Sequence, residues 1–104
     1  MSKIYNEVIN TFGPSDFIKG LNYNSKYVKL IKMEEDEYNR FGTFSVRSER
    51  TYENYHVEVS INKKNKFIEE CFCTCPQYRS TSSCKHITAC ILKYEYELFI
   101  DNEN

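Results

Sequence analysis

The stretch Cys73-Thr-Cys-Pro-Gln-Tyr-Arg-Ser-Thr-Ser-Ser-Cys-Lys-His86 decides how the C-terminal part of this chain folds. It holds three of the 5 cysteines and one of the 2 histidines, in the spacing C-x-C, a gap, then C-x-H. Thiolate sulfur and imidazole nitrogen are the ligands that structural zinc prefers, and four of them complete a tetrahedron. The pattern predicts that Cys73, Cys75, Cys84 and His86 bind one structural Zn²⁺ ion.

A predicted β-hairpin leads into this stretch. In the segment 55–61, apolar and polar residues alternate, as they do in a half-buried strand. Residues 62–65 read as a turn, and 66–74 as the returning strand, which delivers the first two cysteines at its end. Pro76 has no N–H to give to a ladder, so strand pairing should stop there.

A predicted helix leads away from it. Residues 77–83 read as a polar loop, and 84–99 as a helix capped by Ser82 or Ser83. The apolar stripe that should face the sheet consists of Ile87, Cys90 or Ile91, Tyr94 and Leu98. Residues 101–104 read as a polar tail.

Three further residues are alternative ligands by type. Cys71 forms a second C-x-C with Cys73, although Pro76 favours the later pair because it supplies a turn. Cys90 lies one helical turn beyond His86, and we expect it to be a small buried side chain. His56 falls on the polar side of its strand, where a solvent-facing histidine is expected.

The N-terminal part reads as helix followed by strands. Residues 2–12 have helical spacing with Ser2 as cap, Gly13-Pro14 breaks that helix, and 15–19 form a further turn that stops at Gly20. The expected core contacts of this part are Ile4, Val8, Ile9, Phe12, Phe17, Ile18 and Leu21.

Residues 27–33 and 41–47 read as strands, the second with Phe44 and Val46 on one face. The acidic run 34–37 reads as a solvated turn, and 48–53 as a polar connection.

Together these segments predict a single α+β domain over residues 1–104. Its parts are an N-terminal helical segment (1–24), antiparallel strands (25–70), and a zinc finger with the C-terminal helix (71–100). The sheet should be small and antiparallel, with three or four strands. A strand–loop–helix zinc site joins it to the helix.

Composition restricts the function classes. The 104 residues carry 14 basic and 15 acidic side chains, a net charge of −1, whereas nucleic-acid binders usually show a basic excess. No apolar run approaches the roughly 20 residues of a membrane span, and the N-terminus lacks the apolar core of a signal peptide. We expect a cytoplasmic protein, where cysteines serve as metal ligands or buried thiols.

The motif Cys73-x-Cys75-Pro76…Cys84-Lys-His86 resembles the SWIM zinc finger, whose pattern is C-x-C, a variable gap, then C-x-H. Upstream, residues 17–23 and the hairpin are similar to the N-terminal region of bacterial SWI/SNF-type helicases. The likeness covers about residues 14–95. It implies a ββα-type zinc module, with these four residues as ligands, that binds DNA or protein. The phosphate loop of a helicase motor is absent, so we expect either an N-terminal accessory domain of such a helicase or a free-standing SWIM adaptor.

A non-enzymatic interaction module is therefore the predicted function, with protein or DNA as partner and no membrane. The basic residues that could contact nucleic acid are Lys63, Lys64, Lys66, Arg79 and Lys85, and the alternative interpretation is that they are ordinary solubilising side chains. Tyr78 either stacks on bases or packs over the metal site. One alternative is a thiol redox protein using Cys71, Cys73 and Cys75, but no C-x-x-C is present. A zinc hydrolase would need an open coordination position and a general base, which the motif does not supply.

Overall fold

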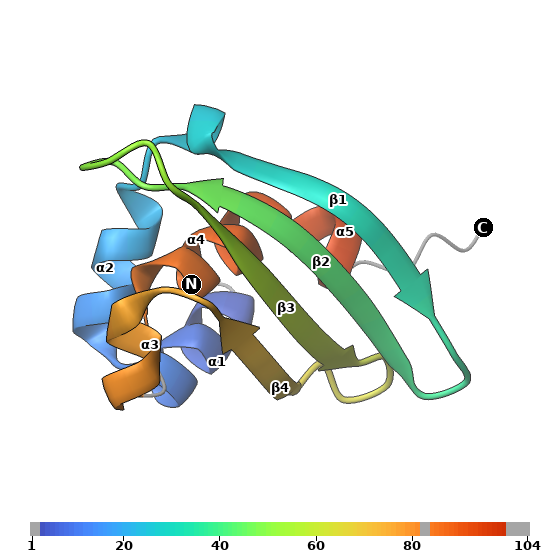
Figure 1. Cartoon of the computed structure of the whole chain (residues 1–104). Helices are drawn as coiled ribbons and strands as arrows, with labels where there is room; N and C mark the ends of the chain where they lie inside the picture. Colours follow the sequence, from blue (N-terminus) through green and yellow to red (C-terminus); the bar gives the residue numbers. More distant parts are fainter. Residues whose placement is uncertain (1–2, 82–83, 100–104) are drawn as a thin grey trace.

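A four-stranded antiparallel sheet covered on one face by helices forms this protein (Figure 1). The computed structural model describes residues 3–81 and 84–99, so the expected caps at Ser2, Ser82 and Ser83 and the tail 101–104 lie outside it. The elements in chain order are α1 (Lys3–Phe12), α2 (Pro14–Leu21), the 3₁₀ turn η1 (Ser25–Tyr27), β1 (Val28–Glu35), β2 (Asn39–Arg47), β3 (Asn54–Asn62), β4 (Ile68–Cys73), α3 (Pro76–Thr81), α4 (Lys85–Lys93) and α5 (Glu95–Phe99).

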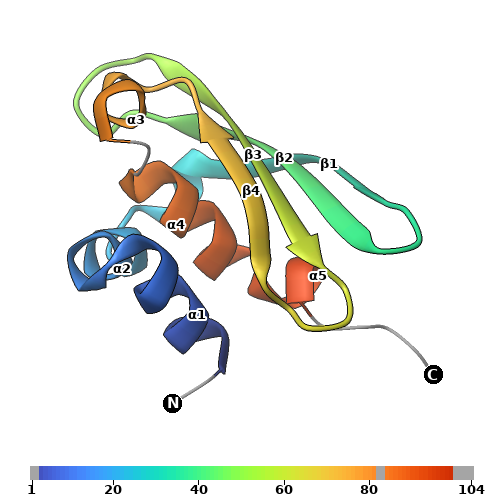
Figure 2. The same ribbon diagram turned by 90° about the horizontal axis from the view of Figure 1, so that it is seen from below.

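The strands follow one another as a meander in the order β1-β2-β3-β4. Successive side chains along each strand point to opposite faces of the sheet, as expected from the two-residue period of a strand. Phe44 and Val46 of β2 lie on the helix-covered face with Val57 and Val59 of β3, and all four are buried. Figure 2 shows α1, α2 and α4 on that one side of the sheet. The predicted α+β fold with a small antiparallel sheet is confirmed.

Helix α4 lies at the centre of the core. Its residues Ile87, Cys90 and Ile91 are fully buried against the sheet and the N-terminal helices, as the predicted stripe requires. Helix α2 approaches α4 so closely that a Cβ on Gly20 would overlap the Thr88 side chain. The Thr88 hydroxyl donates a hydrogen bond to the carbonyl oxygen of Asp16 at 2.8 Å, which fixes this contact.

Two predictions for the C-terminal part are wrong in detail. The segment 77–83 was expected to be a loop, but residues Pro76–Thr81 form α3, because Pro76 suits the first turn of a helix as well as it ends a strand. The single helix expected over 84–99 is broken at Tyr94, whose backbone leaves helical geometry (φ −109°, ψ 32°). The Tyr94 hydroxyl accepts a hydrogen bond from the Leu30 N–H of β1, at 3.2 Å, so the break is accompanied by a contact with the sheet edge.

The N-terminal part also departs from expectation. Phe17 is buried, but Ile18 and Leu21 are 54% and 46% exposed, because α2 turns only one side toward α4. Strand β1 runs on through Glu34 and Glu35, which pair with β2, so the predicted acidic turn is shorter than expected. Among the described residues there is no helix with the length and apolar character that crossing a membrane requires.

Candidate metal centre

The end of β4 and the start of α4 bring four ligand-type side chains together. Cys73 is the last residue of β4, and Cys75 lies in the turn before α3. Cys84 is the N-cap of α4 in extended conformation, which places His86 in the first helical turn. All four side chains are buried.

The ligand atoms of Cys73, Cys75, Cys84 and His86 all lie within 4.8 Å of one another. The Cys73 Sγ and the His86 Nδ1 are 3.9 Å apart. With metal–sulfur bonds of about 2.3 Å, the edge of a tetrahedron measures about 3.8 Å. The cluster therefore matches the size of one tetrahedral site to within about 1 Å, and it can hold one metal ion.

Backbone N–H groups point at two of the sulfurs. The Cys75 N–H donates to Cys73 Sγ at 3.4 Å, and the Tyr78 N–H donates to Cys75 Sγ at the same distance. Donors aimed at sulfur favour the thiolate over the thiol. The second donor belongs to the first turn of α3, so this helix contributes to the site, whereas we expected a loop there.

Burial works against the thiolates. The hydrogen bond with Cys73, and then burial, raise the pKa of the Cys84 thiol well above its usual range, and burial raises the pKa of Cys75. A divalent cation would reverse this balance, because a thiol that coordinates a metal releases its proton to solvent and binds as the thiolate. Three thiols and one imidazole in a buried cluster form a donor set suited to zinc.

Aromatic rings enclose the histidine. The Tyr55 ring centroid lies 4.9 Å from that of His86, and the Tyr23 ring meets His86 edge-on at 5.5 Å. Sequence reasoning did not identify these two residues as part of the site. A signal existed for Tyr55, since it lies on the inward side of β3, two residues before Val57, which pairs with Cys73.

The competing ligand types lie outside the cluster. Cys71 is half-buried on β4 opposite Val59, and burial raises its pKa to about 11. Cys90 is fully buried, as expected for a small core side chain. His56 is exposed and lies 2.7 Å from the carboxylate of Glu58, in agreement with its predicted solvent-facing position.

The predicted basic contacts divide into two groups. Residues 63–66 form the turn between β3 and β4, and Lys63 is engaged there by the Asp36 carbonyl oxygen, at 2.7 Å. This turn is roughly 20 Å along the sheet from the cysteine end, at about 3.3 Å per strand residue. Arg79 and Lys85 lie beside the metal cluster, and the Lys85 ammonium stands over the Tyr23 ring at 5.8 Å. The five residues do not form one patch.

Tyr78 packs over the site. Its hydroxyl donates to the Cys71 carbonyl oxygen at 2.8 Å, and its ring meets that of Phe72 edge-on at 5.7 Å. Of the two roles considered for Tyr78, these contacts favour the one at the metal site.

No protein-family model, curated protein or solved structure matches this chain. The resemblance to the SWIM finger therefore rests on the motif in residues 73–86.

Proposed function

We propose that this protein is a zinc-stabilised, non-enzymatic interaction module of the SWIM type. The observation that carries the proposal is the buried cluster of Cys73, Cys75, Cys84 and His86, whose ligand atoms lie within 4.8 Å of one another. Four protein ligands fill a tetrahedral shell, whereas catalytic zinc keeps one position for water. The zinc would therefore have a structural role and hold β4, α3 and α4 together.

The motif resemblance supports a role beside a nucleic-acid motor. Residues 14–95 resemble the N-terminal region of bacterial SWI/SNF-type helicases, and the proposed role is that of an accessory domain that contacts protein or DNA. A free-standing SWIM adaptor is the alternative. Both roles need the same folded zinc module.

Elemental analysis of two matched variants tests the zinc site. Cys71 and Cys75 both flank Cys73, but only Cys75 belongs to the cluster. Purified wild type and Cys71→Ala should each contain one zinc per chain, and Cys75→Ala should lose it. Wild type that takes up no zinc would overturn the proposal, and loss of zinc from Cys71→Ala alone would show that the wrong C-x-C was chosen.

A further inference from the structure

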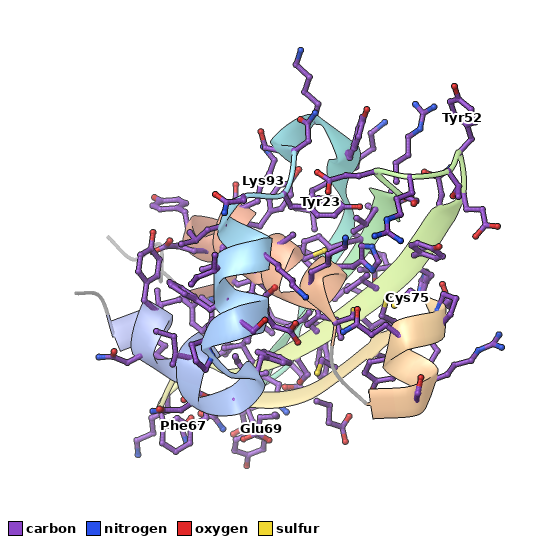
Figure 3. The ribbon with its side chains drawn as sticks, turned by 90° about the vertical axis from the view of Figure 1, so that its left-hand side faces the viewer. Tyr23, Tyr52, Phe67, Glu69, Cys75 and Lys93 are labelled. Atoms are coloured by element: carbon purple, nitrogen blue, oxygen red, sulfur yellow. The ribbon has the colours of Figure 1, made fainter. Side chains whose placement is uncertain are left out.

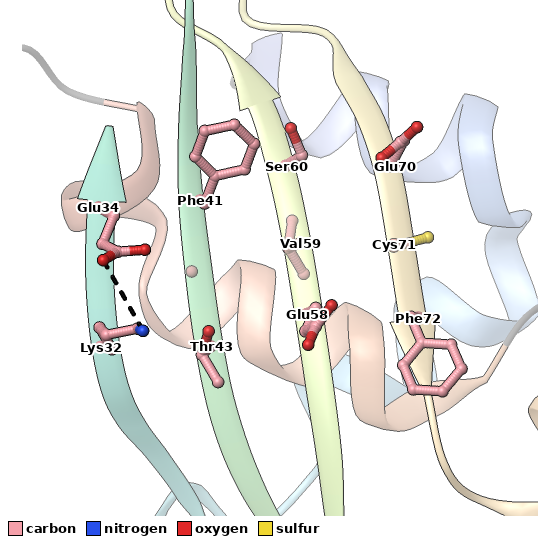
Figure 4. A pocket seen from close by; sticks show the side chains of 11 residues that line it. Lys32, Glu34, Phe41, Thr43, Glu58, Val59, Ser60, Glu70, Cys71 and Phe72 are labelled. Carbon is pink, nitrogen blue, oxygen red and sulfur yellow. Dashed lines mark ion pairs between the residues drawn. The ribbon is translucent and has the colours of Figure 1, made fainter. Parts of the chain in front are cut away.

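The uncovered face of the sheet is divided by charge along its length. At the end near the β1–β2 and β3–β4 turns, this face carries Glu34, Glu58 and Glu70, with Phe41 on β2 and Phe72 on the edge strand β4 (Figure 4). Lys32 is the one cation there among the described residues that line this hollow, and it pairs with Glu34 at 3.7 Å. Phosphate groups would be repelled from this half.

The other half of the same face is cationic. Lys29 pairs with Ser45 across β1 and β2, and Arg47 follows on the same side of β2. Together with Lys26 of η1 they line a cavity of about 510 Å³, whose other described lining residues are Tyr27, Ser45, Tyr52 and Asn54. No carboxylate is among these lining residues. Within the described part of the chain, none of the three cations forms an ion pair, so their charges are available to a ligand.

Arg47 lies between two aromatic rings. Its guanidinium carbon is 4.9 Å from the Tyr52 ring centroid and 5.7 Å from that of Tyr27, which is within cation–π range. Tyr52 lies in the loop between β2 and β3 and is 84% exposed (Figure 3). A ring this exposed, held beside an arginine, leaves aromatic surface free for stacking.

A second basic hollow adjoins the same loop. It measures about 260 Å³, and its lining includes Lys19, Arg50 and Lys85 against one carboxylate, that of Glu49. Glu53 is the other acidic residue of the loop, and it accepts a hydrogen bond from the Tyr55 hydroxyl at 3.2 Å. Cations therefore outnumber carboxylates across both hollows.

We infer that this end of the open sheet face, comprising Lys26, Tyr27, Lys29, Arg47 and Tyr52, binds a single-stranded nucleic acid. Cations without ion-pair partners attract its phosphates, and the exposed Tyr52 ring, with the partly buried Tyr27 ring beside it, can stack on its bases. A duplex keeps its bases stacked on one another, and an acidic peptide has no bases to offer the rings. The carboxylates on the other half of the face limit the site to a few nucleotides.

The inference names the partner of the proposed interaction module. It rests on that binding role, and not on the identity of the metal.

Fluorescence anisotropy with labelled oligo(dT) and oligo(U), about 12 nucleotides long, tests it on the zinc-loaded protein. Binding through three phosphate contacts should weaken roughly fifteenfold between about 50 and 200 mM salt.

Tyr52→Ala should weaken binding roughly tenfold. Its matched control is Tyr38→Ala, because Tyr38 is 66% exposed in the turn at the opposite end of the sheet. Lys29→Glu should reduce both affinity and salt dependence. Lys64→Glu makes the same charge change in the distal turn, outside this site, and should not; an equal loss of binding by Lys64→Glu would instead support the contact named from the sequence and would overturn the inference.

These measurements distinguish DNA from RNA as the bound strand, and a single strand from a duplex or an acidic peptide. Tighter binding of oligo(dT) or of oligo(U) identifies DNA or RNA, and either supports the inference. Equal competition by a poly-glutamate peptide, preference for a duplex, or unchanged binding by Tyr52→Ala overturns it. Circular dichroism and zinc content of each variant are measured on the same samples. A protein with full zinc content that binds neither oligonucleotide overturns this inference and leaves the zinc module intact.

Discussion

The Tyr23 hydroxyl donates a hydrogen bond to the backbone carbonyl oxygen of Arg47, at 2.6 Å. The ring of the same tyrosine packs edge-on against His86. Tyr23 therefore joins the metal cluster to the β2 residue that lies at the centre of the basic end of the sheet. Burial, with the nearby Glu49 carboxylate, raises the pKa of Tyr23 well above its usual range, so the hydroxyl keeps its proton and remains a donor at neutral pH.

Replacing Tyr23 by Phe tests this connection. The variant loses one partly buried hydrogen bond but keeps the ring against His86, so we expect it to lose about 1 kcal/mol of unfolding free energy while its zinc content stays unchanged. Urea denaturation of the zinc-loaded protein measures the loss. Tyr27→Phe is the control, since no hydrogen bond of the Tyr27 hydroxyl is found within the described residues. An equal loss in both variants would show that the Tyr23–Arg47 bond contributes nothing specific.

Removing the metal should unfold the cysteine end before the rest. Zinc binding in small zinc peptides is worth about 10–16 kcal/mol, comparable with the total stability of roughly 5–15 kcal/mol of a domain. Chelation should lower the melting temperature and remove amide protection from α3 and the first turn of α4. Hydrogen exchange with and without chelator measures this residue by residue, and the β1–β2 hairpin serves as internal reference. Unchanged protection of both regions after complete zinc removal would contradict a structural metal.

The sequence predicted those features that depend on local pattern. Alternation in residues 55–61 located β3, and Pro76 correctly favoured Cys75 over Cys71 as the member of the cluster. It could not predict that α3 forms within a polar segment, because the contact that fixes α3 is the Tyr78 hydroxyl on the Cys71 carbonyl oxygen. Nor could it predict the basic end of the sheet, whose residues come from η1, two strands and a loop. Their proximity depends on strand register, which no single window of sequence contains.

Gly20→Ala tests the close approach of α2 and α4. Whether the variant is less or more stable than wild type shows whether the contact between the two helices is tight. In a helix without neighbours, Ala would stabilise by up to about 1 kcal/mol over Gly. Here the new Cβ would overlap the Thr88 side chain, so we expect a loss of roughly 1–3 kcal/mol by thermal or urea unfolding. Lys19→Ala, an exposed neighbour on the same helix, should change stability by less than about 0.5 kcal/mol. If Gly20→Ala were more stable than wild type, the two helices would be able to move apart without a loss of unfolding free energy.

Asp36 gives stability a defined pH dependence at the β1–β2 turn. Its Oδ1 accepts hydrogen bonds from the N–H groups of Asn39 at 2.7 Å and Tyr38 at 2.8 Å, and these bonds, with Lys63 nearby, lower the pKa of the Asp36 carboxyl below its usual range. A carboxyl with a lowered pKa in the folded state stabilises the fold above its unfolded pKa, and this contribution disappears as the pH falls through the folded value.

Wild type should therefore lose stability relative to Asp36→Asn below about pH 4, because the amide does not titrate. Urea unfolding of both proteins from neutral to acid pH measures the difference, and a carboxyl NMR titration gives the pKa of Asp36 directly. A stability difference that stays constant over this range, or an Asp36 pKa at its usual value, would contradict the prediction.

Arg40 is a buried charged residue that the sequence interpretation missed. It lies on the same side of β2 as Phe44 and Val46, just before the strand that we expected over 41–47, and a charged side chain is rarely buried. It is 8% exposed, and its Nη1 donates to the carbonyl oxygen of Leu98 at 3.1 Å. Its Nε donates to the Glu35 carboxylate at 3.1 Å. The guanidinium thus binds the negative C-terminal end of α5 and fixes that helix to the sheet.

Arg40→Ala should cost roughly 2–3 kcal/mol, because charged hydrogen bonds are lost and buried carbonyl groups are left without a donor. Arg40→Lys keeps the charge but not the planar fork, so it should recover only part of this. Glu35→Gln leaves the contacts of Arg40 with α5 in place: it removes only the half-exposed ion pairs of Glu35 with Arg40 and Lys63, and it should cost at most about 1 kcal/mol. Hydrogen exchange should then show faster exchange in α5 for Arg40→Ala and native exchange for Glu35→Gln. If Glu35→Gln destabilised the protein as much as Arg40→Ala, the ion pair and not the helix end would be the reason that an arginine is buried here.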